Sequence, residues 1–322
     1  MKVFKILSLV FLVFSIMFAG IGFVYAQETL MIMGTATTGG TSFMIGSIFC
    51  DIISNNNDAG ISIRPQVTGG TVDDILLIEK GDVELGVIQF SQAYHAYEGI
   101  LQWEGRPQKN LRAITRTTVT TLHLITRKAA GIKSLEDLRG TRGSPGPPGS
   151  GSILITEHVL ESVGLTLDDV HSYYTDYSNT AALLKDGHMD WAKLGMGIPG
   201  STIMDLAAST DITILPVGGA RREKIMKKHP YSYIKSDIPG GIYKGIDEDV
   251  ESIGWVMGIM VDESVPEDVV YNITKTIYEN IEEINKRHSA LKDLSVDNSI
   301  TGLNVPLHPG AERYYREVGR IK

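Results

Sequence analysis

The sequence has a single cysteine, Cys50, in 322 residues. One thiol cannot form an intramolecular disulfide, and it cannot build the cysteine clusters that hold structural zinc or iron–sulfur centres. The eight histidines are scattered, and none has the H-E-x-x-H spacing of a zinc protease. We therefore expect no metal and no cofactor.

Positive charge is also scarce: 30 lysines and arginines face 38 acidic residues, a net charge of −8. A negative surface repels nucleic-acid phosphates. Enzyme signatures such as G-x-x-x-x-G-K-[ST] and G-x-S-x-G are missing. The paired acids at 73–74 and 168–169 fall in predicted first turns of helices, where they favour the helix dipole. We expect neither nucleic-acid binding nor enzymatic activity.

The one long apolar run, at 6–24, follows Lys2 and Lys5 and ends in a small-x-small pattern at Ala26. This order is typical of a cleaved secretory signal peptide, residues 1–26. An uncleaved anchor helix is the alternative, because about 20 apolar residues span a bilayer. Cleavage would change the net charge from −8 to −10. We expect a periplasmic or otherwise extracytoplasmic protein, and a monomer.

Beyond residue 26, short apolar runs alternate with helical patterns, which predicts an α/β fold with mostly parallel sheets. The predicted strands are 30–36, 61–67, 85–89, 171–174, 190–194 and 212–217; the predicted helices are 42–54, 72–80, 153–163, 179–185, 201–208 and a long one at 266–287.

Two adjoining β-rich runs, 111–118 and 121–127, have no strong turn between them. We interpret them as the passage from one domain to a second, and the apolar run 253–261 as the return. The predicted lobes are therefore 27–118 plus 240–322, and 119–239.

Three loops rich in glycine and hydroxyl groups each join an extended segment to a predicted helix. Glycine lets the backbone approach a ligand closely, and the amides of a helix N-terminus suit a carboxylate or phosphate. Each loop alone is explained as an ordinary helix cap, but three at the carboxyl ends of strands favour one ligand site. With the polar strand end at 89–91, they supply these candidates: Thr38, Gly39, Gly40, Thr41, Thr68, Gly69, Gly70, Gln89, Ser91, Pro148, Gly149, Ser150, Gly151 and Ser152.

The segment 195–200 formally matches the G-x-G-x-x-G dinucleotide pattern. The next predicted strand ends in Gly218 and Gly219, with no acid to hold a ribose. We therefore do not expect a dinucleotide site, and we keep Gly197 as a ligand-binding candidate.

These motifs resemble the TAXI family of solute-binding proteins from tripartite TRAP transporters, over essentially the whole chain after residue 26. The matching runs are GTATTGGT at 34–41, VTGG at 67–70, GVIQ at 86–89, IKSLEDLRG at 132–140, GPPGSG at 146–151, DEDV at 247–250 and LHPGA at 307–311.

The resemblance implies a two-lobe type II periplasmic-binding-protein fold, with a hinge and a ligand in the cleft between the lobes. It also implies an anionic solute (a dicarboxylate, an oxo acid or an amino acid) and TRAP permease subunits as partners. A sensory module that signals to a membrane kinase, or an enzyme on the same scaffold, remain the alternatives.

The chain departs from the family at three places that bear on the ligand. Ser42 stands where an aromatic pair usually opens, which leaves Phe43 alone. Phe90 and Ser91 follow the glutamine where many members have a small polar residue and an acid, so a partner for an amino group is lost. Lys193 stands in a strand where apolar residues are usual. We expect Lys193 either to extend to the surface or to face the cleft as a counter-charge.

Overall fold

The computed structural model describes residues 29–322, so the predicted signal peptide lies outside the described residues. Ten strands form one curled sheet in the order β2-β1-β3-β10-β4-β7-β5-β6, with β8 paired to β4 and β9 to β10. The strands are β1 (Thr29–Gly34), β2 (Ile61–Gln66), β3 (Leu85–Gln89), β4 (Leu111–Arg127), β5 (Arg142–Ser144), β6 (His171–Ser172), β7 (Trp191–Met196), β8 (Ile212–Ile214), β9 (Ile234–Lys235) and β10 (Ile253–Asp262).

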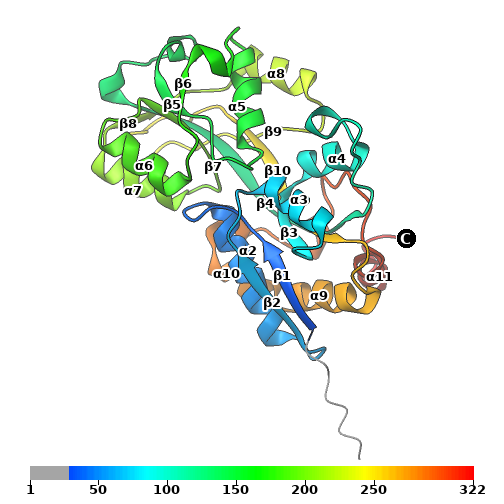
Figure 1. Ribbon diagram of the computed structural model, residues 1–322. Helices are drawn as coiled ribbons and strands as arrows, with labels where there is room; N and C mark the ends of the chain where they lie inside the picture. Colours follow the sequence, from blue (N-terminus) through cyan, green and yellow to red (C-terminus); the bar gives the residue numbers. More distant parts are fainter. Residues whose placement is uncertain (1–28) are drawn as a thin grey trace, which may run out of the picture.

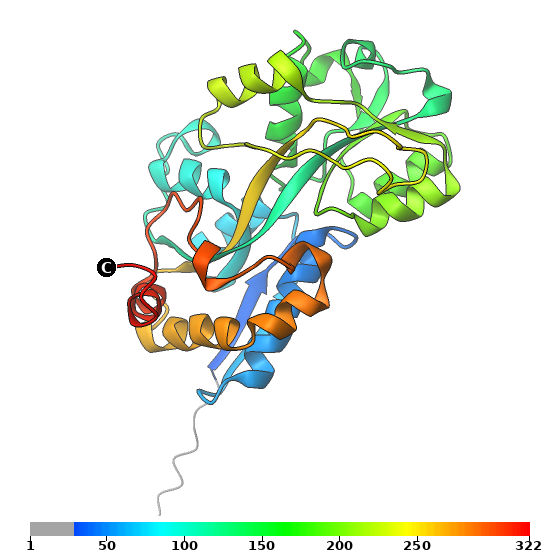
Figure 2. The ribbon, with the colours of Figure 1, turned by 180° about the vertical axis from the view of Figure 1, so that it is seen from behind.

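Helices pack around each end of this sheet, and each end with its helices forms one of two lobes (Figures 1 and 2). The first lobe contains β1 to β3 with α2 (Thr41–Asn56), α3 (Thr71–Lys80), α4 (Phe90–Glu98), α9 (Glu267–Glu279), α10 (Ile281–Arg287) and α11 (Pro309–Glu317). The second lobe contains β5 to β8 with α5 (Ser152–Glu161), α6 (Tyr177–Lys185), α7 (Ser201–Ser209) and α8 (Gly219–Lys228). The α/β fold expected from the alternating pattern is confirmed.

The outer strands of each lobe run parallel, as β1 does with β2 and β3, and β5 with β6 and β7. The two long strands β4 and β10 are antiparallel to their neighbours and pass from one lobe into the other (Figure 1). Up to Thr121 β4 pairs with β10, and from Thr121 onward it pairs with β7. The two β-rich runs predicted at 111–118 and 121–127 are therefore one strand, because a change of partner needs no turn.

The helix predicted at 266–287 is interrupted at Asn280 and forms α9 and α10. The prediction also missed α4, which begins directly after β3, and the basic helix α8, which has few apolar residues. In α4 the apolar residues do follow helical spacing, at positions 90, 93, 94 and 97, but no turn residue separates the helix from β3 to mark its start.

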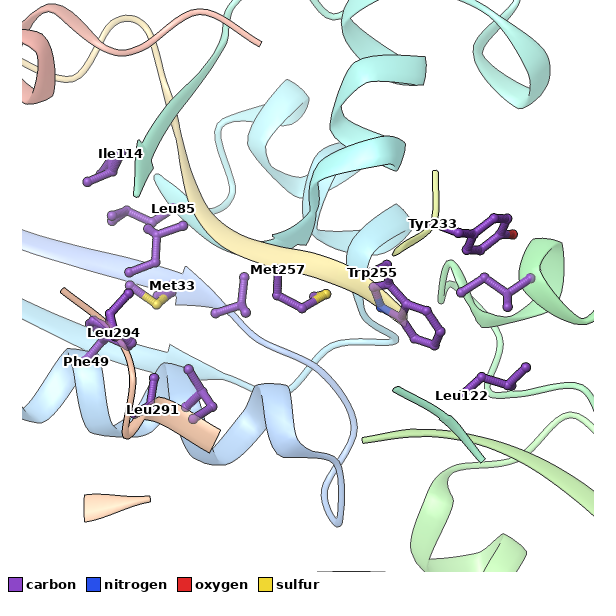
Figure 3. Close-up of a cluster of buried hydrophobic side chains, with 14 of the residues drawn as sticks. Met33, Phe49, Leu85, Ile114, Leu122, Tyr233, Trp255, Met257, Leu291 and Leu294 are labelled. Atoms are coloured by element: carbon purple, nitrogen blue, oxygen red, sulfur yellow. The ribbon is translucent and has the colours of Figure 1, made fainter. Parts of the chain in front are cut away.

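A continuous apolar core runs from the first lobe through the crossing strands into the second. Met33 and Phe49 lie at one end of it, and Leu122 and Tyr233 at the other, with Trp255 between (Figure 3). Gly258 on β10 has no side chain because the ring of Phe90 occupies that space: a Cβ there would lie 2.1 Å from a ring carbon. The crossing strands thus belong to the core as well as to the hinge region.

Candidate ligand-binding site

A cavity of about 60 Å³ lies between the lobes, over the crossing strands. It is lined by the carboxyl ends of strands, the first residues of helices and a few aromatic and apolar side chains. The lining residues are Thr35, Ala36, Thr37, Gly40, Thr41, Ser42, Gly69, Gly70, Thr71, Val87, Gln89, Thr120, Pro147, Ser150, Gly151, Ser152, Ile155, Tyr177, Gly195, Trp255 and Met257. None of these carries a formal charge, so charge must be recognised by dipoles or by groups behind the wall.

Three helices begin at this cavity: α2, α3 and α5, with Gly40, Gly70 and Gly151 at their N-caps. None of the three has an N-cap side chain, because each N-cap is a glycine. In α5 the Ser152 amide donates to the Ser150 hydroxyl over 3.3 Å, and in α3 the amides of Val72 and Asp73 donate to the carbonyl oxygen of Gly149. First-turn amides lack intrahelical partners and carry the positive end of the helix dipole. Gly70 has a φ of 115°, a conformation that residues with a Cβ rarely adopt. Together the helix starts form a site suited to an anion.

The strand ends add side-chain donors and an apolar floor. Gln89, at the end of β3, is almost fully buried, and its amide nitrogen donates to the Ser91 hydroxyl over 2.8 Å. Thr120 and Trp255 are partners in the β4–β10 ladder, so the crossing itself forms part of the lining. The cavity is therefore built in part on both crossing strands.

The lobes touch one another around the cavity. The carbonyl oxygen of Gly149 accepts hydrogen bonds from the backbone amides of Val72 and Asp73, both at 3.0 Å. The Thr202 hydroxyl donates to the carbonyl oxygen of Gly39 over 2.8 Å. The Gly197 amide donates to the Thr41 hydroxyl over 3.2 Å. These contacts join the lobes on more than one side, so the structure is closed around the cavity.

Lys193 is 1% exposed, so the expectation that it extends to the surface is wrong. Its Nζ donates to the Ser152 hydroxyl over 2.8 Å and lies 4.7 Å from the ring centroid of Trp255. It lies on β7 two residues before Gly195, on the same face of the strand, because side chains alternate along a strand. The lysine therefore sits behind the cavity wall and contacts two lining residues.

Eight of the predicted site residues lie together in the lining: Gly40, Thr41, Gly69, Gly70, Gln89, Ser150, Gly151 and Ser152. The other seven, Thr38, Gly39, Thr68, Ser91, Pro148, Gly149 and Gly197, are outside it. Several of them hold the closed arrangement instead: Gly39, Gly149 and Gly197 make the interlobe hydrogen bonds given above. Thr68 accepts from the Gly70 amide, and Ser91 accepts from Gln89.

Sequence reasoning missed several lining residues that come from distant segments. Tyr177 starts α6, and its hydroxyl lies 3.1 Å from that of Ser152 and accepts a hydrogen bond from the Gly195 amide. Trp255 and Met257 were read only as part of an apolar strand. For Trp255 the sequence did offer a signal: it is an aromatic residue in a segment that crosses between the lobes, where a ligand would bind.

Two features of the described residues bear on the class of site. Among residues 29–322, no three His, Cys, Asp or Glu side chains are arranged to hold a metal ion. Within the same residues, no helix combines the length and the apolarity needed to cross a membrane.

Several solved structures resemble this fold. One is PhnD1 of Prochlorococcus marinus in complex with methylphosphonate, with a TM-score of 0.58, 11% identity and coverage of 92% of this chain and 100% of the other. Another is MatC of Rhodopseudomonas palustris with bound malate, with a TM-score of 0.58, 13% identity and coverage of 91% and 97%. A structure described as a periplasmic transporter gives a TM-score of 0.56 at 14% identity, with coverage of 92% and 94%.

At these identities the likeness concerns the fold, which is that of periplasmic solute-binding proteins. The sequence itself gives the family. The model of the NMT1-like family matches residues 33–319, nearly all of the described chain. The protein therefore belongs to the NMT1-like family.

Proposed function

We propose that this protein is an extracytoplasmic receptor that captures a small carboxylate-containing solute between its lobes and delivers it to a TRAP-type membrane permease. The observation that carries the proposal is the convergence of three helix N-termini, those of α2, α3 and α5, each with a glycine at its N-cap, on one cavity between the lobes. Backbone amides at helix starts bind anions without a permanent counter-charge.

Two further observations support an anionic solute and a transport role. MatC holds malate and PhnD1 holds methylphosphonate on folds similar to this one, and both ligands are anions. The TAXI-like runs at 34–41 and 146–151 contribute residues to the lining of the cavity. On this proposal, residues 1–26 are the export signal and the protein acts outside the cytoplasm as a binding protein, without catalysis.

The lobes of the receptor would be residues 27–118 with 240–322, and residues 119–239. Opening would break the interlobe hydrogen bonds of Gly39, Gly149 and Gly197, while β4 and β10 remain continuous. A ligand that contacts both lobes shifts the population toward the closed form, which the permease would recognise.

A small carboxylate should raise the melting temperature, because a ligand that binds only the folded state stabilises it. At a hundredfold excess over its Kd the gain is about 2.7 kcal/mol, or roughly 5–10 °C in Tm. Differential scanning fluorimetry with acetate, pyruvate, malonate, malate, 2-oxoglutarate and glutamate measures it. If no carboxylate in the panel shifts Tm at millimolar concentration, the proposal fails.

Replacing Gln89 by alanine should weaken binding of the carboxylate with the highest affinity by about 1–3 kcal/mol. The reason is that a buried oxygen of the ligand loses its hydrogen-bond partner. Calorimetric titration measures the change. Gln108→Ala is the matched control, since Gln108 is equally buried but donates to the carbonyl oxygen of Arg106 away from the cavity. Equal affinities for Gln89→Ala and the parent protein would remove Gln89 from the site.

A further inference from the structure

Lys193 is a buried cation without an anionic partner. Its ammonium group has one hydrogen-bonding contact, the Ser152 hydroxyl, and one aromatic contact, the ring of Trp255. Among residues 29–322, no carboxylate comes within ion-pair distance of it. Burying an uncompensated charge is strongly unfavourable, so Lys193 either loses its proton or is stabilised as a cation by a negative charge that enters the cavity beside it.

The ammonium group lies immediately behind the cavity wall. A Cβ added at Gly195, which lines the cavity, would lie 3.2 Å from the Nζ of Lys193 and 2.6 Å from a ring carbon of Trp255. Glycine at this position therefore leaves the space that the lysine and the indole occupy. Packing thus explains why the first residue of the formal G-x-G-x-x-G match, Gly195, is a glycine.

Two hydroxyl groups connect the lysine to the cavity. The Gly195 amide donates to the Tyr177 hydroxyl, and that hydroxyl lies 3.1 Å from the hydroxyl of Ser152. When the Tyr177 hydroxyl is the donor of its hydrogen bond with Ser152, the Ser152 oxygen accepts hydrogen bonds from both Tyr177 and Lys193. The hydroxyl hydrogen of Ser152 is then free to point into the cavity that Ser152 lines.

We propose that Lys193, acting through Ser152, is the counter-charge for a small monocarboxylate, and that this solute binds together with one proton. The inference rests on the proposed function and specifies its substrate class. One buried cation offsets one negative charge, and no lining residue carries another. A water occupies about 10–15 Å³ by the same measure as the 60 Å³ cavity, so the space suits a solute of about four to six non-hydrogen atoms.

The proton follows from the surroundings of the lysine. Burial lowers the pKa of Lys193 to about 7, and an anion beside the ammonium group would raise it again. The titratable groups that face it are His123 on β4, whose pKa burial lowers to about 4, and Tyr177 on α6, whose pKa burial raises. The neighbouring groups on α5 and β10, Ser152 and Trp255, do not titrate. Near neutral pH, Lys193 is the group of this set that changes charge.

The sign of the pH effect follows from linkage. Below pH 7 the lysine is already charged, and an anion binds at full affinity. Above pH 7 the unliganded lysine is neutral, so binding must take up a proton and the apparent affinity falls by up to about tenfold per pH unit. The apparent affinity stops falling at the pH at which Lys193 loses its proton in the complex as well.

The test is calorimetric titration with sodium pyruvate and sodium acetate between pH 6 and pH 9. Titrations at pH 8 in Tris and in triethanolamine, which differ in ionisation enthalpy, give the number of protons taken up; we expect a value of about one. Lys193→Met should bind at least about tenfold more weakly at pH 6.5 and without pH dependence. His123→Gln should retain the proton uptake, because His123 is neutral throughout this range.

The outcomes separate the two proposals. If pyruvate or acetate binds without proton uptake, or binds Lys193→Met as tightly as the parent protein, the inference about Lys193 is wrong and the receptor proposal stands. If malonate binds more tightly than both monocarboxylates, the substrate class is wrong. If no carboxylate binds at any pH, the receptor proposal and this inference fall together.

Discussion

The free energy of unfolding should fall steeply between pH 6.5 and pH 4.5. Burial lowers the pKa of His95 and of His123 to about 4, and that of His158 to about 3. The same side chains in an unfolded chain have a pKa of about 6.5. Between these values the unfolded chain binds protons that the folded chain does not, so acid favours unfolding.

The expected size of this effect is large. Each such histidine contributes about 1.4 kcal/mol per pH unit, so the three together contribute up to about 4 kcal/mol per unit. Buried Asp74, which keeps its proton in the folded chain, offsets about one of these three protons, so two units would remove about 5 kcal/mol net. This is comparable with the lower end of the total stability of about 5–15 kcal/mol of a typical domain. We therefore expect the protein to be strongly destabilised near pH 5 at room temperature.

One of these histidines, His158, packs on a further histidine, His229, at the end of α8 in the same lobe. His158 on α5 stacks on His229 with ring centroids 3.4 Å apart, and its Nδ1 lies 2.6 Å from the Tyr233 hydroxyl. After burial, the nearby charge of His229 is the next cause that lowers the pKa of His95 on α4 and of His158. Protonation therefore adds like charges between α4 of the first lobe and α5 and α8 of the second.

Urea unfolding at pH 7.5, 6.5, 5.5 and 4.5 measures this dependence. His123→Gln and His158→Gln should each reduce the slope of the free energy of unfolding against pH by up to about 1.4 kcal/mol per pH unit, because each removes one proton that only the unfolded chain binds. His171→Gln is the control, since His171 is exposed and the change should leave the slope unaltered. A free energy that stays constant from pH 7.5 to pH 4.5 would contradict the prediction.

Asp74→Asn should stabilise the protein, and more strongly as the pH rises. Asp74 on α3 is fully buried, and neither carboxyl oxygen has a hydrogen-bond partner of standard geometry in the described structure. Burial raises its pKa well above the usual range, and the nearby Thr68 hydroxyl offsets the rise only in part. The folded chain therefore holds a proton that the unfolded chain, with a pKa of about 3.9, has lost.

The sign is the reverse of that for the histidines. Above pH 4 folding must take up a proton at Asp74, so the cost grows by about 1.4 kcal/mol per pH unit until the folded carboxyl ionises. Asparagine has nearly the same shape and no such cost. Its gain in the free energy of unfolding should thus be larger at pH 7.5 than at pH 5.

Urea unfolding of the Asp74→Asn variant at these two pH values tests the prediction. Asp73→Asn is the matched control, because the carboxylate of Asp73 accepts a hydrogen bond from the Gly69 amide over 2.9 Å. Its replacement removes a charged acceptor and should bring no gain. A destabilised Asp74→Asn variant, or a gain independent of pH, would show that Asp74 is ionised in the folded protein.

Local patterns in the sequence predicted the elements that carry the cavity. The glycine–hydroxyl loops at 38–41, 68–71 and 146–152 precede helices as expected, because turn and cap preferences act over a few residues. Eight residues from these loops and from the end of β3 line one cavity. Their role in binding stays a prediction.

The sequence by itself determined the α/β alternation, the starts of α2, α3 and α5 to within one residue, and the two crossing segments. Only the tertiary structure decided that β4 is one strand with two successive partners, that Tyr177 and Trp255 join the cavity, and that Lys193 is buried behind Gly195. The physical reason is range: propensities and caps depend on neighbours in the chain, whereas the surroundings of a lysine depend on strands and helices that meet only after folding.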